Sequence, residues 1–352
     1  MIVNTTKLKK MLSHVNKIKP NSLLEITNYI ELDFNNNNQL VIKAYDGSNY
    51  MTVIDDNNLD GDRGSVIVKT DQFTKLVNKT TADQMTLKVF DDYLKVKGNG
   101  TYKVEIVNGE IFPDYEIDES LTKYEGLTPM LKHGIQAAKN AKSLNAADGV
   151  LYGFLLRDNK ITTSDAMKVC VSEFESEGIE ALLPPVLAGL VNVLDGDNVR
   201  MLYDQDREMM TFIGKSVTIS GPTMDGVEGY PNIVEIAEAM QPSICTIDTQ
   251  ELIQALDRLG LFVGPYDLNL IKLAFVDDNI TIQTDSGSIE TIEYKEGSGH
   301  IEDIVYTVNR KLLYELVAAV DSPSLQVGYG DPDLIKLESD KDIMLLSISD
   351  EM

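Results

Sequence analysis

Paired carboxylates are the side chains of this sequence with the clearest capacity for chemistry. Asp195-Gly-Asp197 and Asp331-Pro-Asp333 each bring two acids close together, and such pairs can divide general acid and general base work between them. Both pairs fall in turn-like stretches between predicted strands, where Asp is favoured because its carboxylate accepts hydrogen bonds from the local backbone. We therefore interpret both pairs as turns rather than as a catalytic site.

The histidines and cysteines show no spacing typical of a metal or nucleophilic site. His14, His133 and His300 lie far apart, and Cys170 and Cys245 stand in apolar, strand-like contexts. The sequence contains no HExxH, CxxC, Walker loop, nucleophile elbow or GxGxxG between a strand and a helix. We expect no metal, no cofactor and no enzymatic activity. The cysteines are expected to be buried apolar residues of a protein from a reducing compartment.

Length and composition point to a soluble protein of several domains. A chain of 352 residues exceeds the usual size of one hydrophobic core, so two or three domains are expected. The hydrophobic content is 43%, but no long uncharged apolar run predicts a membrane-spanning helix. The first residues, MIVNTTKLKKML, lack the apolar stretch of a signal peptide. We expect a cytoplasmic location.

One module is written three times along the chain. Each copy has a short opening strand, an amphipathic helix, several strands, a second, shorter helix and further strands. Leu8, Met11, Leu12, Val15 and Ile18 show the helical spacing that predicts the opening helix of the first copy. The first helices of the three copies are predicted over 5–19, 126–143 and 247–262, and the second helices over 67–79, 182–194 and 306–320.

Turn residues divide the strand regions into hairpins, and aromatic-proline turns divide the copies. The predicted hairpin turns are Asn36-Asn37, Asp158-Asn159 and Asp278-Asn279, each between β-branched and aromatic runs. Phe112-Pro113 and Tyr230-Pro231 close the first two copies. The chain is therefore predicted to form three two-layer α+β domains, because the repeats are far longer than those of a solenoid. The predicted domains are 1–120, 121–242 and 243–352.

The repeat order resembles that of the bacterial DNA polymerase III beta subunit, the sliding clamp family. The resemblance spans the whole chain and includes GEIFPDYEI at the end of the first copy and YTVNRKLLYELVAAVDSPSLQVGYG in the third. It implies a DNA clamp fold in a ring-shaped homodimer, with helices lining a central hole and antiparallel sheets outside. It also implies a processivity factor for DNA replication that binds double-stranded DNA without sequence preference, a DNA polymerase, a clamp loader and other proteins with a clamp-binding motif. The Asn-rich run and divergent tail suggest a phage-encoded or distant member, so the compartment is the bacterial cytoplasm or an infected host cell.

Charge distribution tests this resemblance. A formal net charge of −25 opposes phosphate binding, which depends on Lys and Arg. However, the helical segments 6–19, 71–80, 128–143, 184–195, 248–259 and 309–321 together carry a net charge of +6 and the rest of the chain −31. The charge is therefore segregated as a DNA channel requires. A merely solvated lysine face is the alternative for each residue. The candidate DNA contacts, chosen by helical phase, are Lys10, Lys17, Lys75, Lys132, Gln136, Lys139, Arg258 and Lys311.

The resemblance further implies an apolar cleft between the second and third domains that binds a short linear peptide of each partner. The family's Gly-His-Arg corresponds to Ala166, Met167 and Lys168 here, and the tail after Leu346 also departs from the family's ending. We expect the cleft to persist with a changed peptide preference, because Met is an adaptable wall residue. Ordinary core positions are the alternative for the apolar members. The candidate cleft residues are Leu151, Ser164, Met167, Lys168, Val169, Pro231, Ile236, Leu268, Asn309, Leu312, Leu345, Leu346, Ser347 and Ile348.

Ring closure is expected where an edge strand of the first domain meets one of the third domain in a second copy. Val104 and Ile106, together with Phe262 and Val263, are the predicted apolar seal. The alternative to a clamp is a repeat-built structural or scaffold protein that does not encircle DNA. That alternative does not explain an excess of Lys on the helices.

Overall fold

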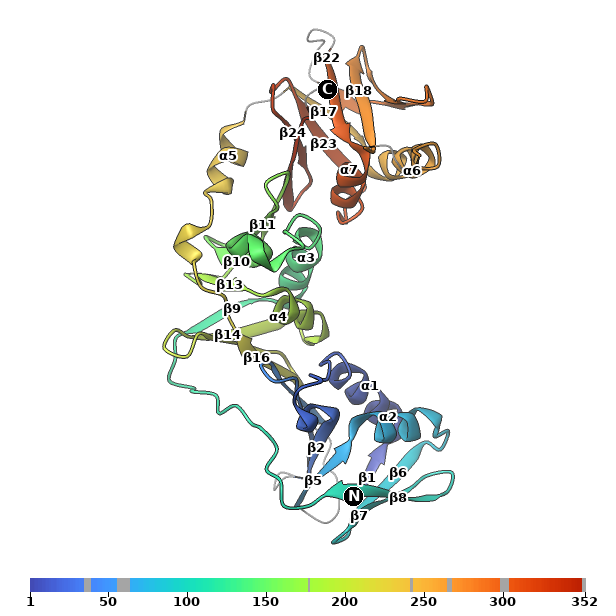
Figure 1. The fold of residues 1–352 in the computed structure, drawn as a ribbon, viewed down its shortest axis with the longest axis vertical. Coiled ribbons are helices and arrows are strands. Elements are labelled where there is room, and N and C mark those ends of the chain that lie inside the picture. The colour runs from blue at the N-terminus through green and yellow to red at the C-terminus, as the bar shows by residue number, and fades with distance from the viewer. Residues whose placement is uncertain are drawn as a thin grey trace. The chain divides into compact units, whose positions relative to one another are not determined.

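The computed structural model describes residues 1–34, 39–55, 64–176, 178–240, 243–264, 268–297 and 304–349. The chain divides into two compact units, which are described separately here (Figure 1). Unit 1 holds Met1–Pro129 and Val186–Thr223, and unit 2 holds Met130–Pro185 and Met224–Met352. The middle repeat contributes strands to both units, and the predicted three-domain boundaries stay a prediction. Among the described helices, none is long and apolar enough to cross a membrane.

The first repeat follows the predicted order. Its elements are β1 (Ile2–Asn4), α1 (Thr5–Val15), η1 (Glu25–Asn28), β2 (Tyr29–Phe34), β3 (Leu40–Tyr45), β4 (Tyr50–Asp55), β5 (Gly64–Lys69), α2 (Thr70–Lys79), β6 (Gln84–Val89), β7 (Tyr93–Lys97) and β8 (Thr101–Val107).

The second repeat has the same order, with the second helix shortened. Its elements are β9 (Lys123–Leu127), α3 (Thr128–Ala138), η2 (Ala146–Tyr152), β10 (Phe154–Arg157), β11 (Lys160–Ser164), β12 (Lys168–Glu173), β13 (Ala181–Leu183), α4 (Pro185–Leu190), η3 (Val191–Val193), β14 (Asn198–Asp204), β15 (Met209–Ile213) and β16 (Val217–Pro222). A connecting segment follows, with η4 (Val227–Gly229) and α5 (Ile233–Ala239).

The third repeat closes the chain. Its elements are β17 (Ser243–Asp248), α6 (Thr249–Gly260), β18 (Leu270–Val276), β19 (Asn279–Thr284), β20 (Ile289–Glu293), β21 (Glu296–Gly297), β22 (Ile304–Asn309), α7 (Arg310–Val317), β23 (Ser324–Tyr329), β24 (Leu334–Glu338) and β25 (Asp342–Ser347).

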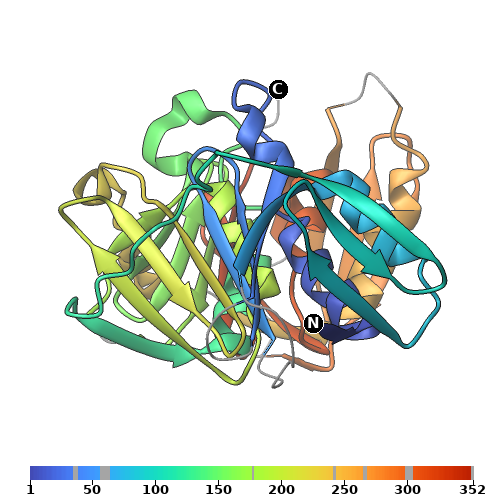
Figure 2. The ribbon, with the colours of Figure 1, turned by 90° about the horizontal axis from the view of Figure 1, so that it is seen from below.

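Local sequence explains where the helices begin and end. Asn4, Asp248 and Asn309 cap α1, α6 and α7, because each side chain accepts a hydrogen bond from a backbone N–H of the first turn. The predicted helix over 5–19 already ends at Val15, and the N–H of the C-cap residue Asn16 donates to the Leu12 carbonyl. Pro20 disfavours helical backbone only at Lys19. The apolar face of α1 is buried, and α1 packs against α2, β3 and β4 (Figures 1 and 2).

The strands form antiparallel sheets that confirm the predicted α+β class. Unit 1 holds one sheet in the order β1-β6-β7-β8-β5-β2-β3-β4-β16-β15-β14-β9. Unit 2 holds two, in the orders β13-β10-β11-β12-β25-β24-β23-β17-β21 and β20-β19-β18-β22. Successive repeats are therefore joined by strand pairs, β4 with β16 and β12 with β25.

Turns occupy the positions where the sequence placed them. Asp158 and Asn159 both have positive φ, as expected of a tight hairpin turn. Asp331 accepts hydrogen bonds from the backbone N–H of Asp333 and Leu334, and Asp195 accepts bonds from Ser216. The local hydrogen bonding expected of a turn is thus confirmed for Asp331, whereas the carboxylate of Asp195 bonds to a residue 21 positions away. The predicted turn at Asn36-Asn37 lies outside the described residues.

Candidate functional site

A tight turn between β11 and β12 presents the first part of the candidate cleft. Ser164 Oγ accepts a hydrogen bond from the backbone N–H of Ala166, at 3.1 Å, and Asp165 Oδ1 accepts bonds from the N–H groups of Met167 and Lys168. Ala166 has a φ of 72°, a left-handed conformation that favours glycine. The turn leaves the Met167 side chain projecting into solvent, 47% exposed.

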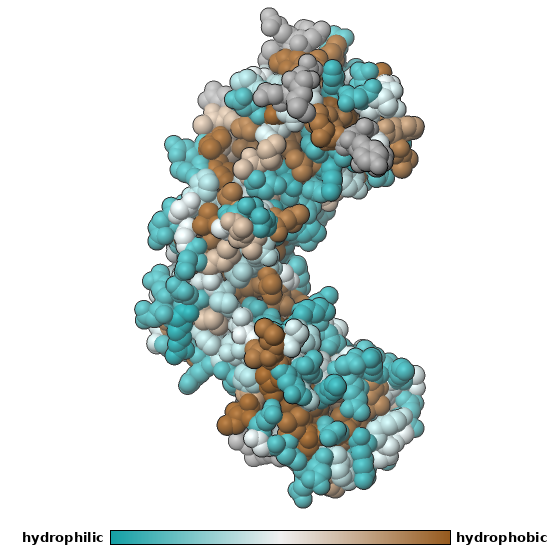
Figure 3. All heavy atoms as spheres, in the orientation of Figure 1, coloured by the Kyte–Doolittle hydropathy of each residue, from teal (hydrophilic) through white to brown (hydrophobic). Residues whose placement is uncertain are grey.

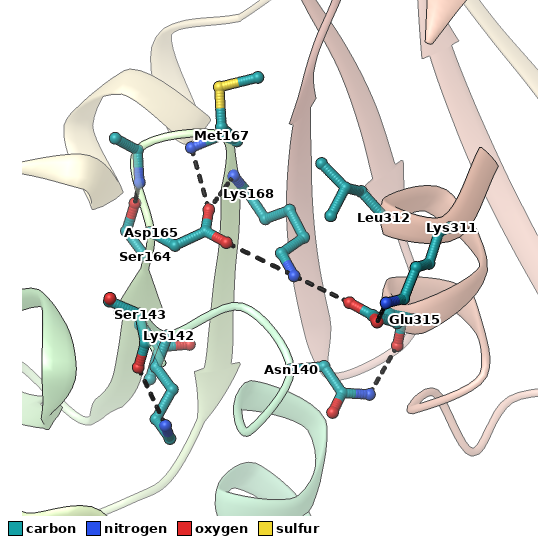
Figure 4. Close-up of polar contacts among 12 residues, drawn as sticks. Asn140, Lys142, Ser143, Ser164, Asp165, Met167, Lys168, Lys311, Leu312 and Glu315 are labelled. Carbon is teal, nitrogen blue, oxygen red and sulfur yellow. Dashed lines mark hydrogen bonds and ion pairs between the residues drawn. The ribbon is translucent and has the colours of Figure 1, made fainter. Parts of the chain in front are cut away.

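Lys168 points away from the solvent-exposed side of this turn (Figure 4). Its side chain is 6% exposed, and its Nζ lies 3.0 Å from Glu315 Oε2 on α7 and 3.4 Å from Asp165 Oδ2. Asn140 Nδ2 donates to the backbone carbonyl of Glu315 at 2.8 Å. Lys168 therefore connects the middle repeat to the third repeat. This differs from the expectation that it lines the cleft.

An apolar cluster lies beside this turn, under α5 and η4. Leu155, Val171, Leu182, Tyr230 and Ile233 are buried together. Burial is also the main cause that raises the pKa of the Tyr230 phenol. The predicted cleft residues Leu151 and Val169 pack against this cluster as half-buried side chains. Figure 3 shows apolar surface beside α5.

A pocket of about 480 Å³ opens along one flank of α5. Its apolar lining includes Leu155, Pro231, Ile233 and Val234, and its rim includes polar side chains such as Glu235. Of these residues only Pro231 follows from the resemblance. The others lie on β10 and on α5. In α5 the buried residues Ile233 and Ala237 are four positions apart, which is the helical spacing that indicates a helix packed on the core.

The C-terminal segment lies across the same region. The Ser347 N–H donates to the Met167 carbonyl, and the Ile348 N–H donates to the Asp333 carbonyl. Ser347 Oγ also donates to Met167 Sδ, at 3.6 Å. Met167, Ser347 and Ile348 are thus near one another, while Ile236 is exposed on α5.

Other predicted cleft residues have different surroundings. Leu268, Asn309 and Leu312 meet at the start of α7, where the Asn309 side chain donates to the Leu268 carbonyl and accepts from the Leu312 N–H. Ser164, Leu345 and Leu346 are buried. These three side chains are covered by their own chain, so they pack within the sheet. They do not line the cleft, contrary to the expectation from the resemblance.

The candidate DNA contacts fall into two groups. Lys10, Lys17, Gln136 and Lys139 are exposed, and Lys132 is half-buried. Within the described part of the chain, none of these lysines forms a salt bridge. Their positive charge is therefore available to an external anion.

The remaining three cations have carboxylate partners. Lys75 Nζ lies 2.7 Å from Asp71, and Lys311 Nζ lies 3.9 Å from Glu315. Arg258 makes two hydrogen bonds to Glu290, of 2.7 and 2.8 Å, and this contact holds the pKa of the Glu290 carboxyl below its usual value. We therefore rank these three below the unpaired lysines as phosphate contacts.

The predicted interface residues are only partly exposed. Val104 is 1% exposed, because its side chain faces the core of its own sheet. It therefore cannot contribute to an apolar seal, and this expectation is corrected. Ile106 and Val263 are half-buried, whereas Phe262 is 59% exposed. Exposed apolar neighbours that sequence reasoning missed are Tyr102, Leu261 and Ile289.

Comparison with known proteins agrees with the repeat order and the fold. No protein-family model matches the chain. The beta sliding clamp of Staphylococcus aureus is 20% identical over 94% of this chain and 93% of its own length, and that of Bacillus subtilis is 20% identical over 80% and 79%.

Solved structures match over nearly the full length. The beta subunit of the Streptococcus pyogenes DNA polymerase has a TM-score of 0.87 at 15% identity and covers 99% of both chains. The Helicobacter pylori beta clamp bound to a DNA ligase peptide has a TM-score of 0.84 at 15% identity, again over 99% of both chains. The chain therefore has the fold of the bacterial DNA polymerase III beta subunit, and the resemblance to the sliding clamps that its three repeats predict is confirmed.

Proposed function

We propose that the chain is a processivity factor, a sliding clamp that encircles duplex DNA as a homodimer and tethers the replicative polymerase. The observation that carries this proposal is the equivalence of its two strand joints. Each joint pairs the third hairpin-region strand of one repeat with the last strand of the next repeat, β4 with β16 and β12 with β25. Because both joints within the chain have the same strand pairing, we expect a third joint of the same kind between the third repeat of one subunit and the first repeat of another.

The strands for that third joint are β20 and β8. They hold the equivalent positions in the third and first repeats. Among the described strands β20 pairs only with β19, whereas β8 pairs with β7 on one side and, at Ile106 and Val107, with β5 on the other. A second copy supplies a partner for β20 and for the part of β8 that β5 does not pair with, and two such joints close a ring of two subunits. Phe262, Leu261 and Ile289 are exposed near β20 and provide apolar area for the closure.

Sequence-independent DNA binding follows from the unpaired helix lysines. Lys10, Lys17 and Lys139 contact phosphates, which carry no base information, and such contacts suit a protein that slides. The net charge of −31 on the rest of the chain repels DNA from other surfaces.

The partners bind at the pocket along α5, whose lining includes Leu155, Pro231 and Ile233, with Ile236 exposed on the same helix. An extended peptide with a few apolar anchors fits a preformed apolar groove of this kind. A DNA polymerase, a clamp loader and other proteins with a clamp-binding motif share this cleft. The protein acts in the bacterial cytoplasm, or in the infected host cell if it is phage-encoded.

Retention on circular DNA tests the proposed function. The protein is loaded with a clamp loader and ATP on nicked circular DNA, which is then isolated with and without linearisation. If the protein encircles DNA, it should be retained on the circular DNA and should slide off the ends of the linearised DNA. A Lys10→Glu/Lys17→Glu variant should be retained less, since two phosphate contacts become repulsive. Equal retention on circular and linear DNA, or none on either, would favour the scaffold alternative.

A further inference from the structure

Strands β6, β7 and β8 carry a row of lysines that the proposed function does not use. In the antiparallel register Lys88 lies opposite Lys95, and Lys95 lies opposite Lys103. Lys97 lies two residues beyond Lys95 and so shares its face. All four side chains are exposed, and they are called the lysine row below.

The lysine row lies on the solvent-exposed face of the sheet formed by β6, β7 and β8, whose strands Figure 1 labels. The residues that alternate with it, such as Leu87, Leu94, Val96 and Val104, are at most 1% exposed and form the core. Because successive side chains in a strand point to opposite faces, the lysines must face solvent. They are distinct from the lysines on the helices.

The lysine row is electrostatically unfavourable in the isolated chain. Like charges directly opposite each other destabilise a sheet, and here they occur in a chain with 56 acidic and only 31 basic residues. Among the residues that the structure describes, none of the four lysines forms a salt bridge. The nearest acids in the strands and turn are Glu105, opposite Tyr93, and Asp91 and Asp92 in the β6–β7 turn. An external polyanion would relieve this repulsion.

Two aromatic rings lie beside the lysine row, and their surroundings bear on how a polyanion would be recognised there. Phe90 and Tyr93 stack on each other with centroids 4.8 Å apart. Lys88 Nζ lies 5.6 Å from the Phe90 centroid, and Lys103 Nζ lies 4.5 Å from the Tyr93 centroid. The rings are therefore occupied by each other and by ammonium groups. Nucleobases gain little stacking there, so recognition depends on charge.

We propose that the lysine row binds the phosphate backbone of single-stranded nucleic acid. A flexible single strand can bend so that successive phosphates lie against basic side chains on an open sheet face. Cross-strand neighbours are about 4.8 Å apart and residues two apart along a strand about 6.6 Å apart, so one strand can contact three or four lysines. The inference rests on the proposed function in one respect, since DNA held in the ring supplies adjoining single strand at high local concentration.

Salt-dependent binding of an oligothymidylate of about 20 nucleotides tests the proposal. Fluorescence anisotropy is measured with the full chain between about 50 and 200 mM salt. Three or four contacts predict a slope of log K against log salt of about −2 to −3. A Lys95→Ala/Lys97→Ala variant should bind at least about tenfold more weakly at low salt, with a slope shallower by about 1.4.

The control variant Lys215→Ala/Lys341→Ala removes the same charge from two exposed turn lysines outside the row. Its affinity should stay within about twofold of wild type, because phosphate contacts act locally at these salt concentrations. Equal affinities of the row variant and the control variant would overturn the proposal. So would binding of a labelled poly-glutamate peptide that depends on Lys95 and Lys97 when the oligothymidylate does not bind, which would indicate an acidic protein partner.

Failure of this inference is separable from failure of the proposed function. The Lys95→Ala/Lys97→Ala variant leaves the helix lysines and β8 unchanged, so it should keep the dimer mass and be retained on nicked circular DNA. Loss of oligothymidylate binding with normal retention supports the lysine row. Absence of retention in the wild-type protein would instead refute the clamp function, whatever the anisotropy shows.

Discussion

Replacing Lys168 by Met should destabilise the protein without removing an apolar contact surface. Met preserves most of the aliphatic stem but deletes the ammonium group that bridges Glu315 and Asp165. Breaking a fully buried ion pair costs about 3–5 kcal/mol. Here the cost is smaller, because the Glu315 side chain is 32% exposed and that of Asp165 is 23% exposed, so water can solvate both carboxylates in part. We expect a loss of about 2 kcal/mol in the free energy of unfolding.

Thermal unfolding followed by calorimetry measures this loss. For a cooperative unit of about 150–250 residues, each kcal/mol shifts Tm by about 2–4 °C, so Lys168→Met should melt about 4–8 °C lower. Lys311→Met is the matched control. It removes an ammonium group that is also near Glu315 but 66% exposed, and it should cost less than about 0.5 kcal/mol.

A double-mutant cycle decides whether the ion pair is the cause. Lys168→Met/Glu315→Met replaces both charges by apolar groups, and such replacements are often close to neutral. The double variant should therefore be more stable than the sum of the single losses by about 1–3 kcal/mol. Additive losses, or a Tm for Lys168→Met within about 1 °C of wild type, would refute the role of Lys168 as a connection between repeats.

Three further changes test other parts of the structure. Ile106→Glu should place a charge in the proposed seal and convert a dimer of about 78 kDa, twice the 39.0 kDa of one chain, to monomers in light scattering; an unchanged mass would contradict the assignment. Ile236→Glu should weaken binding of a clamp-binding peptide from the cognate polymerase at least about tenfold in anisotropy, whereas Glu228→Gln on η4, an exposed residue outside the pocket lining, should not. Ser216→Ala should lower the free energy of unfolding by about 1 kcal/mol at pH 7. Burial raises the pKa of Asp195, but hydrogen bonds from Ser216 outweigh it and lower the pKa, so this stabilisation is present above the usual Asp range and lost as pH falls through the lowered value. A difference between wild type and variant that persists in strong acid would exclude that explanation.

The repeat order was predictable because it rests on local signals. Helix periodicity, caps such as Asp248 and Asn309, and turn pairs such as Asp158-Asn159 act over a few residues. The helix α5 was missed because seven residues are too short for a clear period. The strand joints were not predictable either, since the paired residues of β12 and β25 are separated by about half of the chain.

The candidate site was predictable only where side chains act locally. Lys168 was assigned to the cleft by its position in a family motif, but its partner Glu315 is 147 residues away. Similarly, Val104 was assigned to an exposed seal, but its pairing with Leu94 places it on the core face of the sheet, whereas its neighbours Lys103 and Glu105 are exposed. Because a shift of one residue reverses every side chain of a strand, composition alone does not decide which of these neighbours is exposed.

The chemistry of the joints bears on how the proposed ring opens. The joint between β12 and β25 combines strand pairing with buried polar contacts, for Asp342 accepts hydrogen bonds from Ser172 and lies 2.9 Å from His133 Nε2. A buried carboxylate left without partners is costly, so this joint resists separation. The proposed joint between β8 and β20 offers exposed apolar residues such as Phe262. Separating the two subunits there exposes apolar surface gradually and leaves no buried charge without a partner. Since the joints within the chain are also linked covalently, a loader that opens the ring meets the least resistance between subunits.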